Sequence, residues 1–283
     1  MPGLPWIAYV RAALLAGDAP SPTLTDSTYQ LKCSVGTLKL PRTPASLTAP
    51  RLPLQLKNGL QISVETLATL LNMLNANYVS ALQVAYPEML GIVISSQGAY
   101  SVSLQALLKL RIPTPPTLAL PVTPQLLPEP FLRLVETALA GYGGNAPIVF
   151  HSTPSMVWTT ISRTTIGTAL PDVDKWLDLT KVTEQCEDPS AQSLDVSLNA
   201  LRDKQTLLTL ANATHLELSP EGARVVSAGM EYTWEEVHTP TPLRLPFDKT
   251  MKILTLAATL KRSSPRLVHL EGPEVEAFVS TRE

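Results

Sequence analysis

The spacing of apolar and polar positions divides this chain into many short elements. Between residues 28 and 41, apolar and polar side chains alternate on both sides of Gly36, which predicts a β-hairpin. A second hairpin is predicted at 52–62, because Asn58-Gly59 stands between two alternating runs and favours a tight turn. Segments of this kind indicate a chain rich in antiparallel strands.

Helical periodicity is confined to a few short segments. Ser63 can cap a helix that runs to about Asn77, with apolar residues at steps of three and four along one face. Residues 4–17 and 131–140 predict two further short helices. Strand-like runs are predicted at 79–86, 90–95, 99–112 and 147–170.

A proline-rich segment marks the clearest domain boundary. Seven of the eighteen residues at 113–130 are proline, which is typical of an extended linker. We therefore predict one domain at 1–112 and a second at 131–283, joined by this connector. The second domain includes residues 131–190, which we interpret as a divergent or inserted segment.

The last third of the chain shows the most regular order. A strand and a helix are followed by four strands, a second helix and two further strands, separated by turn residues. Asp248 can cap the second helix, which is predicted to run to about Lys261. The predicted bounds are 193–198 (strand), 199–212 (helix), 214–219, 223–229, 230–237 and 242–247 (strands), 248–261 (helix), and 266–271 and 274–281 (strands).

Composition supports a globular α+β protein and narrows its partners. Hydrophobic residues make up 45% of the 283 residues, enough for a sizeable core, while 26 prolines disfavour long helices. The formal net charge of −2 gives no strong overall attraction to nucleic acid, so any DNA contact must come from a local basic patch. No uncharged apolar stretch of about 18 residues occurs, and no membrane partner is expected.

Motifs for catalysis, cofactors and metals are missing from the sequence. The glycine-rich residues 141–144 lack the lysine of a phosphate-binding loop, and the acidic stretch at 172–188 lacks calcium-loop spacing. The four histidines are far apart in the sequence. Cys33 and Cys186 indicate no disulfide framework, which favours a reducing, intracellular environment. We predict a non-catalytic protein that needs no cofactor and no metal.

Two segments carry a resemblance to a known family. The order of elements at 193–283 resembles one domain of the DNA sliding clamp family, which includes PCNA and the checkpoint clamp. The likeness is carried by THLELSPEGARVVSAG and by PLRLPFDKTMKILTLAATLKRSSPRLVHLEGPEVEAFVS, and residues 60–110 show a similar run. The resemblance implies an α+β fold of two sliding-clamp-like domains, each with curved antiparallel sheets and two helices.

The resemblance also implies a ring that encloses DNA, with helices lining the hole. Basic residues on the helices of the last third would then contact phosphates without sequence preference. An ordinary solvated helix face would show the same charges. The helix predicted at 63–77 has no Lys or Arg, which suits a divergent subunit of a heteromeric ring. The candidate DNA-binding residues are Arg11, Arg202, Lys204, Lys249, Lys252, Lys261 and Arg262.

The connector supplies candidates for partner binding. Leu118, Leu120 and Val122 alternate between its prolines and, by the resemblance, would border a pocket for the peptides of partner proteins. These side chains could equally pin the linker to its own domain. The expected partners are double-stranded DNA, other clamp subunits in a trimeric ring, and clamp-binding peptides of replication, repair or checkpoint proteins. The expected location is the nucleus, or the cytoplasm if the protein is viral.

Two other classes of protein fit the same composition. A chain rich in Thr, Pro and Leu, with many strands and few charges, also suits a viral capsid or another assembly protein. Large particles would favour that alternative, and three-protomer rings would favour the clamp. An enzyme whose catalytic residues are dispersed along the sequence is the third possibility.

Overall fold

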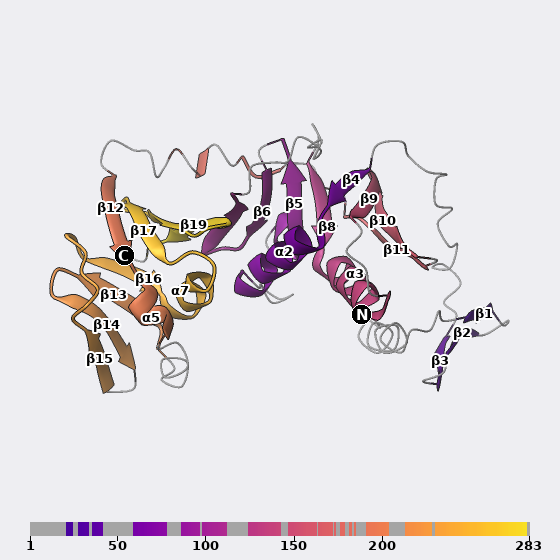
Figure 1. Cartoon of the computed structure of the whole chain (residues 1–283), viewed down its shortest axis with the longest axis horizontal. Helices are drawn as coiled ribbons and strands as arrows, with labels where there is room; N and C mark the ends of the chain where they lie inside the picture. Colours follow the sequence, from indigo (N-terminus) through magenta and orange to yellow (C-terminus); the bar gives the residue numbers. More distant parts are fainter. Residues whose placement is uncertain are drawn as a thin grey trace. The chain divides into compact units, whose positions relative to one another are not determined.

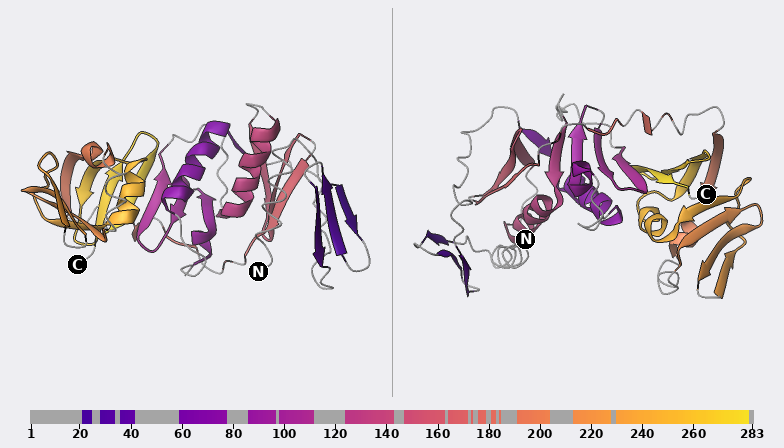
Figure 2. Two further views of the ribbon diagram at one scale, coloured as in Figure 1. Left: turned by 90° about the horizontal axis from the view of Figure 1, so that it is seen from below. Right: turned by 180° about the vertical axis from the view of Figure 1, so that it is seen from behind.

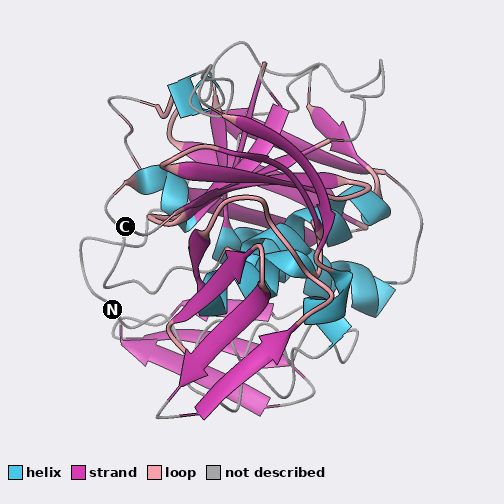
Figure 3. Ribbon diagram, turned by 90° about the vertical axis from the view of Figure 1, so that its left-hand side faces the viewer, coloured by secondary structure: helices cyan, strands magenta, loops and turns pink. Residues whose placement is uncertain are grey.

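Strands make up most of the regular structure, with a few helices beside them. The computed structural model describes residues 21–24, 28–33, 36–41, 59–77, 86–96, 98–111, 124–142, 147–162, 164–171, 173, 176–178, 181–182, 184, 191–203, 213–227 and 230–281. The predominance of strands is plain in Figure 3, and every strand pairing with a known register is antiparallel. The expected α+β class is therefore confirmed.

The first of two compact units comprises residues 1–67 and 128–172. Its described part holds a three-stranded sheet in the order β1-β2-β3 and a four-stranded sheet in the order β11-β10-β9-β4. Helix α3 packs on β10 and β11. Its Phe131 also contacts Phe150 of β9 edge to face, with the ring centroids 5.6 Å apart. The elements are β1 (Ser21–Leu24), β2 (Thr28–Cys33), β3 (Gly36–Pro41), β4 (Leu60–Ile62), α3 (Glu129–Tyr142), β9 (Ile148–Thr153), β10 (Met156–Ile161) and β11 (Thr164–Ala169).

The second unit comprises residues 68–127 and 173–283 and is built on an eight-stranded sheet. The strand order is β12-β17-β18-β19-β7-β6-β5-β8. Most of α2 belongs to this unit, and Figure 1 shows α2 and α7 on the same side of the sheet. The elements are α2 (Val64–Ala76), η2 (Pro87–Leu90), β5 (Gly91–Ser95), β6 (Gly98–Val102), β7 (Ala106–Leu110), β8 (Gln125–Pro128), β12 (Gln192–Ser197), β17 (Thr259–Ser263), β18 (Leu267–Glu271) and β19 (Val275–Ser280).

The second unit also contains a four-stranded sheet in the order β15-β14-β13-β16. Helix α7 contacts β13, β16 and the short helix α5. In the left view of Figure 2, α2 (purple) and α7 (yellow) lie in front of the eight-stranded sheet. The elements are α5 (Asn199–Asp203), β13 (His215–Ser219), β14 (Gly222–Ser227), β15 (Met230–Trp234), β16 (Leu243–Pro246) and α7 (Phe247–Leu254).

A row of opposed apolar residues forms the core beneath the eight-stranded sheet. Leu108 of β7 lies opposite Ala277 of β19, which lies opposite Leu270 of β18, and Leu270 lies opposite Leu260 of β17. All four side chains are fully buried. Because residues opposite each other share one face, this row places the apolar face of four neighbouring strands on the same side.

A five-element motif occurs four times along the described chain. Each motif is a strand, a helix and three strands, namely β4-α2-β5-β6-β7, β8-α3-β9-β10-β11, β12-α5-β13-β14-β15 and β16-α7-β17-β18-β19. Successive motifs exchange their first strands, because β4 pairs with β9, β8 with β5, β12 with β17, and β16 with β13. Two motifs therefore build two sheets together.

Several local predictions are confirmed by this arrangement. Strands β2 and β3 form the hairpin expected at 28–41. Helix α2 begins where expected, because the hydroxyl of Ser63 accepts the backbone N–H of Thr66 at 3.0 Å. The first arm of the hairpin expected at 52–62 lies outside the described residues, and β4 pairs with β9. The helix at 4–17 and the strand at 79–86 also lie outside the described residues.

Two predicted elements are wrong in extent. The single strand expected at 99–112 is two strands, β6 and β7, because Ser103 turns the chain by accepting the backbone N–H of Ala106. The helix expected to reach Lys261 ends at Leu254, and β17 follows as a strand. The closing part of the chain therefore has three strands after α7, where two were predicted.

The proline-rich connector leads into the sheet that precedes it. Residues 125–128 of the predicted connector form strand β8, which is hydrogen-bonded beside β5 in the eight-stranded sheet. Residues 129–169 form α3, β9, β10 and β11 and so complete a motif like the other three. The predicted bounds of two domains stay a prediction, but neither the connector nor the segment after it interrupts the motif order.

Candidate nucleic-acid and partner-binding surfaces

The candidate DNA-binding residues fall into three groups. Lys249 and Lys252 lie on α7, and the exposed Arg202 lies on α5, which contacts α7. Arg11 and Lys204 lie outside the described residues. Lys252 is exposed and forms an i,i+4 ion pair with Asp248 at 2.7 Å.

Lys261 and Arg262 lie on β17 and not on the helix where they were predicted. Lys261 sits at an irregularity of both strand pairings, between the buried Leu260 and the exposed Arg262. Its Nζ contacts Asp195 at 2.8 Å and Glu271 at 3.9 Å. The hydrogen bond to Asp195 raises the pKa of Lys261. These two residues therefore belong to a strand surface already occupied by acidic partners.

Lys249 has a different environment from the one predicted. Its side chain is half-buried, and its Nζ donates to the backbone oxygen of Ala76 at 3.5 Å and to Oδ1 of Asn77 at 3.3 Å. The amide of Asn77 in turn donates to Ser101 and to the backbone oxygen of Ala106. Burial lowers the pKa of Lys249 to about 8, with nearby Lys252 adding to the effect. Lys249 thus ties α7 to the end of α2.

The described helix surfaces carry opposing charges in similar numbers. Helix α2 exposes no cation, as the sequence predicted, and its exposed positions are Glu65, Ala68, Asn72 and Asn75. On α3, Arg133 lies 3.6 Å from both Glu129 and Glu136. These helices alone make no strongly positive surface, and the predicted DNA contacts stay a prediction.

Strands β7 and β19 join elements from distant parts of the chain into one sheet. Lys109 of β7 lies directly opposite Glu276 of β19, and their charged groups are 3.3 Å apart. Helix α2 reinforces this junction, because Thr69 donates to the carboxylate of Glu274 at 2.6 Å. We call this pairing and its contacts the β7–β19 junction.

A histidine and a phenylalanine extend the junction along the same sheet. The rings of His269 and Phe278 are stacked 4.8 Å apart, and Nε2 of His269 lies 3.3 Å from Glu276. The side-chain hydrogen bond with His269 is the main cause that lowers the pKa of Glu276, and Lys109 lowers it to a smaller extent. Burial acts in the opposite direction and raises this pKa. A half-buried carboxylate is thus kept ionised by polar partners on both neighbouring strands.

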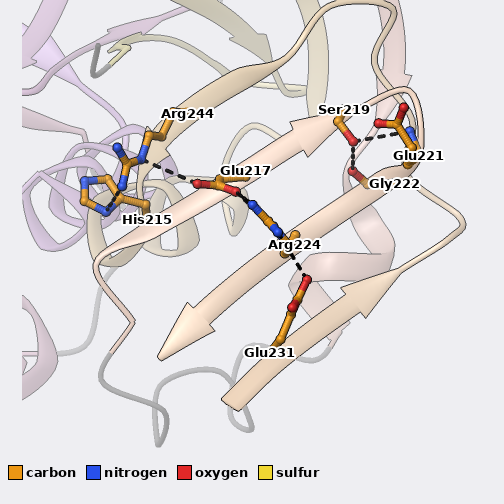
Figure 4. A network of polar contacts seen from close by, with 8 residues as sticks. All are labelled: His215, Glu217, Ser219, Glu221, Gly222, Arg224, Glu231 and Arg244. Atoms are coloured by element: carbon orange, nitrogen blue, oxygen red, sulfur yellow. Dashed lines mark hydrogen bonds and ion pairs between the residues drawn. The ribbon is translucent and has the colours of Figure 1, made fainter. Parts of the chain in front are cut away.

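A ladder of alternating charges crosses the other sheet of the second unit. Figure 4 shows Arg244 of β16, Glu217 of β13, Arg224 of β14 and Glu231 of β15 in a row. Glu217 lies 3.6 Å from Arg244 and accepts the Nε of Arg224 at 2.9 Å, and Arg224 lies 3.4 Å from Glu231. Glu217 also raises the pKa of Arg224. We call this row the charge ladder.

Sequence reasoning did not identify the charge ladder. Its members are spread over 28 positions, from Glu217 to Arg244, and come together only through the strand register. The signal was a charged residue between apolar neighbours in the predicted strands, as at Glu217, Arg224 and Arg244. Such a pattern indicates the solvent face of a sheet.

One end of the eight-stranded sheet exposes large apolar side chains. Leu90 precedes β5 and Leu104 follows β6, and the antiparallel register places both at the same end of these strands. Their exposed fractions are 40% and 63%, and Tyr86 at the start of η2 is exposed at 61%. The end of β19 is also here, because Ser280 donates its N–H to Gln105. We call Tyr86, Leu90 and Leu104 the apolar rim.

The peptide-binding residues predicted from the connector, Leu118, Leu120 and Val122, lie outside the described residues. Sequence reasoning missed the apolar rim, although Leu104 stands between Ser103 and Gln105, where an isolated leucine in a polar turn was visible. Exposed apolar side chains that gather at one place are typical of interaction surfaces.

The described residues hold neither a metal-binding cluster nor a membrane-spanning helix. No group of three or more His, Cys, Asp or Glu side chains is arranged to hold a metal ion in the part of the chain that the structure describes. Within the same residues, no helix is both long and apolar enough to cross a membrane.

Comparison with known proteins identifies the fold through structure alone. No protein-family model and no curated sequence matches the chain. The DNA polymerase beta subunit of Streptococcus pyogenes has a TM-score of 0.64 and 14% identity, and a putative DNA polymerase III beta subunit from Eubacterium rectale has 0.64 and 10%. The Helicobacter pylori beta clamp bound to a DNA ligase peptide has 0.59 and 14%.

These likenesses extend over nearly the whole chain. In each of the three comparisons the match covers 93% of this chain and 76% of the other. This chain has the fold of the DNA sliding clamps.

Proposed function

We propose that this chain is a non-catalytic subunit of a ring that encloses double-stranded DNA. The β7–β19 junction is the observation that carries the proposal. It joins two motif pairs edge to edge into one sheet, and repetition of such a joint generates an extended wall with helices on one side. The solved structures with this fold include DNA polymerase beta subunits, which supports a role at DNA.

Enclosure reconciles a DNA role with the modest charge of the helices. A closed ring retains DNA by topology, so the attraction of each contact to phosphate can be weak. The exposed Arg202 and Lys252 are the described candidates for such contacts. Lys249 is a poor one, because its amine faces Ala76 and Asn77. The number of chains in the ring, predicted as three, is part of the proposal.

The apolar rim is proposed to bind peptides from proteins that act on DNA. One structure with this fold is a Helicobacter pylori beta clamp bound to a DNA ligase peptide. An extended peptide with large apolar side chains would cover Leu90 and Leu104, which solvent now reaches. Recruitment of replication or repair proteins is part of this proposal, while a checkpoint role and a nuclear location stay predictions.

Retention on circular DNA tests the enclosure. The full chain is incubated with a nicked circular plasmid, and bound protein is separated from free protein at high salt, where simple phosphate contacts are weakened. We expect protein to stay with the circular plasmid and to be released when a restriction enzyme linearises it. Equal loss from circular and linear plasmid would contradict enclosure.

Fluorescence anisotropy tests the rim with a labelled DNA ligase peptide. We expect Leu104→Asp to weaken peptide binding by about tenfold or more, because a buried apolar anchor commonly contributes about 2 kcal/mol. Val149→Asp is the matched control, since Val149 is also an exposed apolar residue, at 36%, but lies on β9. Equal weakening by both substitutions, or by neither, would rule out the rim as the binding surface.

A further inference from the structure

A buried glutamate lies beneath the apolar rim. Glu88 belongs to η2 and stands between the exposed Tyr86 and Leu90, yet it is only 3% exposed. Helix η2 contacts β5 and β6. Burial and, to a smaller extent, Glu88 raise the pKa of Tyr100 on β6, which places the carboxyl group near this ring. Glu88 therefore points into the protein where its two apolar neighbours are exposed to solvent.

The carboxyl group of Glu88 is hydrogen-bonded to a distant part of the chain. Its Oε1 accepts the backbone N–H of Leu177 at 2.8 Å, across 89 positions of sequence. Leu177 lies with Trp176 and Asp178 between β11 and β12, in the stretch that leads from the second motif to the third. The sequence showed this stretch only as acidic. We call residues 176–178 the strap.

The other carboxyl oxygen of Glu88 makes this side chain costly to bury. Its Oε2 is buried and has no hydrogen-bond partner among the described residues. A buried carboxyl group that is only partly hydrogen-bonded lowers stability relative to an apolar side chain of similar size. Such a departure from an apolar core is expected where a residue has a role other than stabilising the core. The hydrogen bond to the strap supplies that role.

The strap brings a further apolar side chain to the rim. Three of the large apolar side chains that the described residues expose form the rim, and a fourth belongs to Leu177, which is 37% exposed. Its backbone is held at η2, the element that carries Leu90 and follows Tyr86. The exposed large apolar residues are Tyr86, Leu90, Leu104, Val149, Leu177 and Tyr232.

We propose that Glu88 is a positioning residue that fixes the strap against η2, so that Leu177 becomes a fourth apolar contact for a bound peptide. This inference rests on the proposed function of the rim and adds to it the residue that controls peptide affinity. A strap that is already fixed spares the peptide the entropic cost of ordering it on binding. Glu88 itself is buried and does not touch the peptide.

Amide hydrogen exchange of the full chain tests the hydrogen bond without any peptide. Glu88→Met removes the acceptor and fills a similar volume with an apolar side chain, whereas Glu88→Gln keeps an oxygen for the Leu177 N–H. We expect the Leu177 amide to exchange about fivefold or more faster in Glu88→Met, and to stay close to the wild-type rate in Glu88→Gln. Equal rates in all three proteins would overturn the proposal.

The amides of β5 are the internal control for this experiment. Val93 and Ile94 are fully buried and paired with β6, so their exchange should stay slow in both variants. Faster exchange of Val93 and Ile94 in Glu88→Met would also overturn the proposal, because Glu88 would then stabilise the core and not the strap alone.

Fluorescence anisotropy with the labelled DNA ligase peptide tests the role of the strap in binding. We expect Glu88→Met and Leu177→Ala each to weaken binding about fivefold or more, while Glu88→Gln binds like the wild type. Leu177→Ala keeps the backbone N–H, so its exchange rate at this position should change little. The matched control is Asp178→Ala, which removes the next exposed side chain of the strap and should leave affinity unchanged.

The two experiments together separate the strap from the rim. Unchanged peptide affinity in Glu88→Met, despite faster exchange at Leu177, would overturn the proposed role of the strap. Loss of binding in Leu104→Asp but in neither Glu88→Met nor Leu177→Ala would support the rim and contradict the strap. Faster exchange in Glu88→Met, with no peptide binding by the wild type, would support Glu88 as the residue that fixes the strap and contradict the proposed function of the rim.

Discussion

Strands β19 and β15 occupy equivalent places in their motifs but have different neighbours. Each is the last of three strands after a helix, and each carries a glutamate on its polar face. Glu276 of β19 faces Lys109 of β7, whereas Glu231 of β15 is contacted only from within its own sheet among the described residues. The difference shows what the β7–β19 junction adds to the sheet, namely an opposed ion pair and a continuous apolar row beneath it.

The largest expected effect comes from the apolar side of the completed joint. Leu108→Ala should lower the free energy of unfolding by about 2–5 kcal/mol, because Leu108 is fully buried between β6 and β19. Tyr232→Ala on β15 should cost clearly less in the isolated chain, since that side chain is 37% exposed. Urea denaturation measures both. Similar losses for the two variants would mean that the two edges are equally buried.

The second effect concerns Lys249, which ties α7 to α2 beside the joint. Its pKa is about 8 in the folded chain, against about 10.5 for an unfolded lysine. The unfolded chain therefore binds more protons between these values, and stability should rise with pH from about 8 to 10.5, by roughly 1–2 kcal/mol. The measurement is urea denaturation across this range. Lys249→Met is the control, and an identical pH profile for the variant would contradict the assignment.

The third effect is electrostatic and lies on the polar side of the joint. Glu276→Gln should lower the free energy of unfolding by about 1 kcal/mol, because Lys109 and His269 lose an ionised partner in a half-buried place. Because the pKa of Glu276 is lowered in the folded chain, its contribution is present above about pH 4.5 and is lost as the pH falls further. Acid unfolding followed by circular dichroism should therefore be less steep in the variant.

The smallest effect is expected at the open edge. Glu231→Gln should change the stability of the single chain by less than about 0.5 kcal/mol, because Glu231 is 51% exposed and its contact with Arg224 is screened by solvent. A stability loss as large as that of Glu276→Gln would contradict the expectation that Glu231 contributes less to stability than Glu276.

Local patterns were enough to predict some elements, whereas distant partners decided others. Helix α2 follows from its periodicity and from the capping hydroxyl of Ser63, both within a short window of sequence. Strand β17 was hidden, because Lys261-Arg262 reads as the basic end of a helix, and only pairing with β12 and β18 makes it a strand. The position of Lys249 depends on Asn77, which is 172 residues away in the sequence.

The same limit applies to the candidate surfaces. Proline content predicted an extended linker at 113–130, whereas residues 125–128 of this segment form strand β8 and complete an existing sheet. The apolar rim arises because the register of β5 and β6 brings Leu90 and Leu104 to one end. Spacing along the sequence does not show which strand ends lie together in the folded sheet. Neither the place of β8 in the sheet nor the apolar rim could therefore be located from the sequence.

The exchange of first strands between motifs has a consequence for biosynthesis. Strand β12 leaves the ribosome well before β17, its hydrogen-bonding partner, and β4 likewise precedes β9. Until the second motif of each pair has been made, the first strand has no sheet to join and its backbone groups stay unpaired. Folding must therefore wait for whole motif pairs, and a ribosome that stalls between two paired motifs would release a chain prone to aggregation.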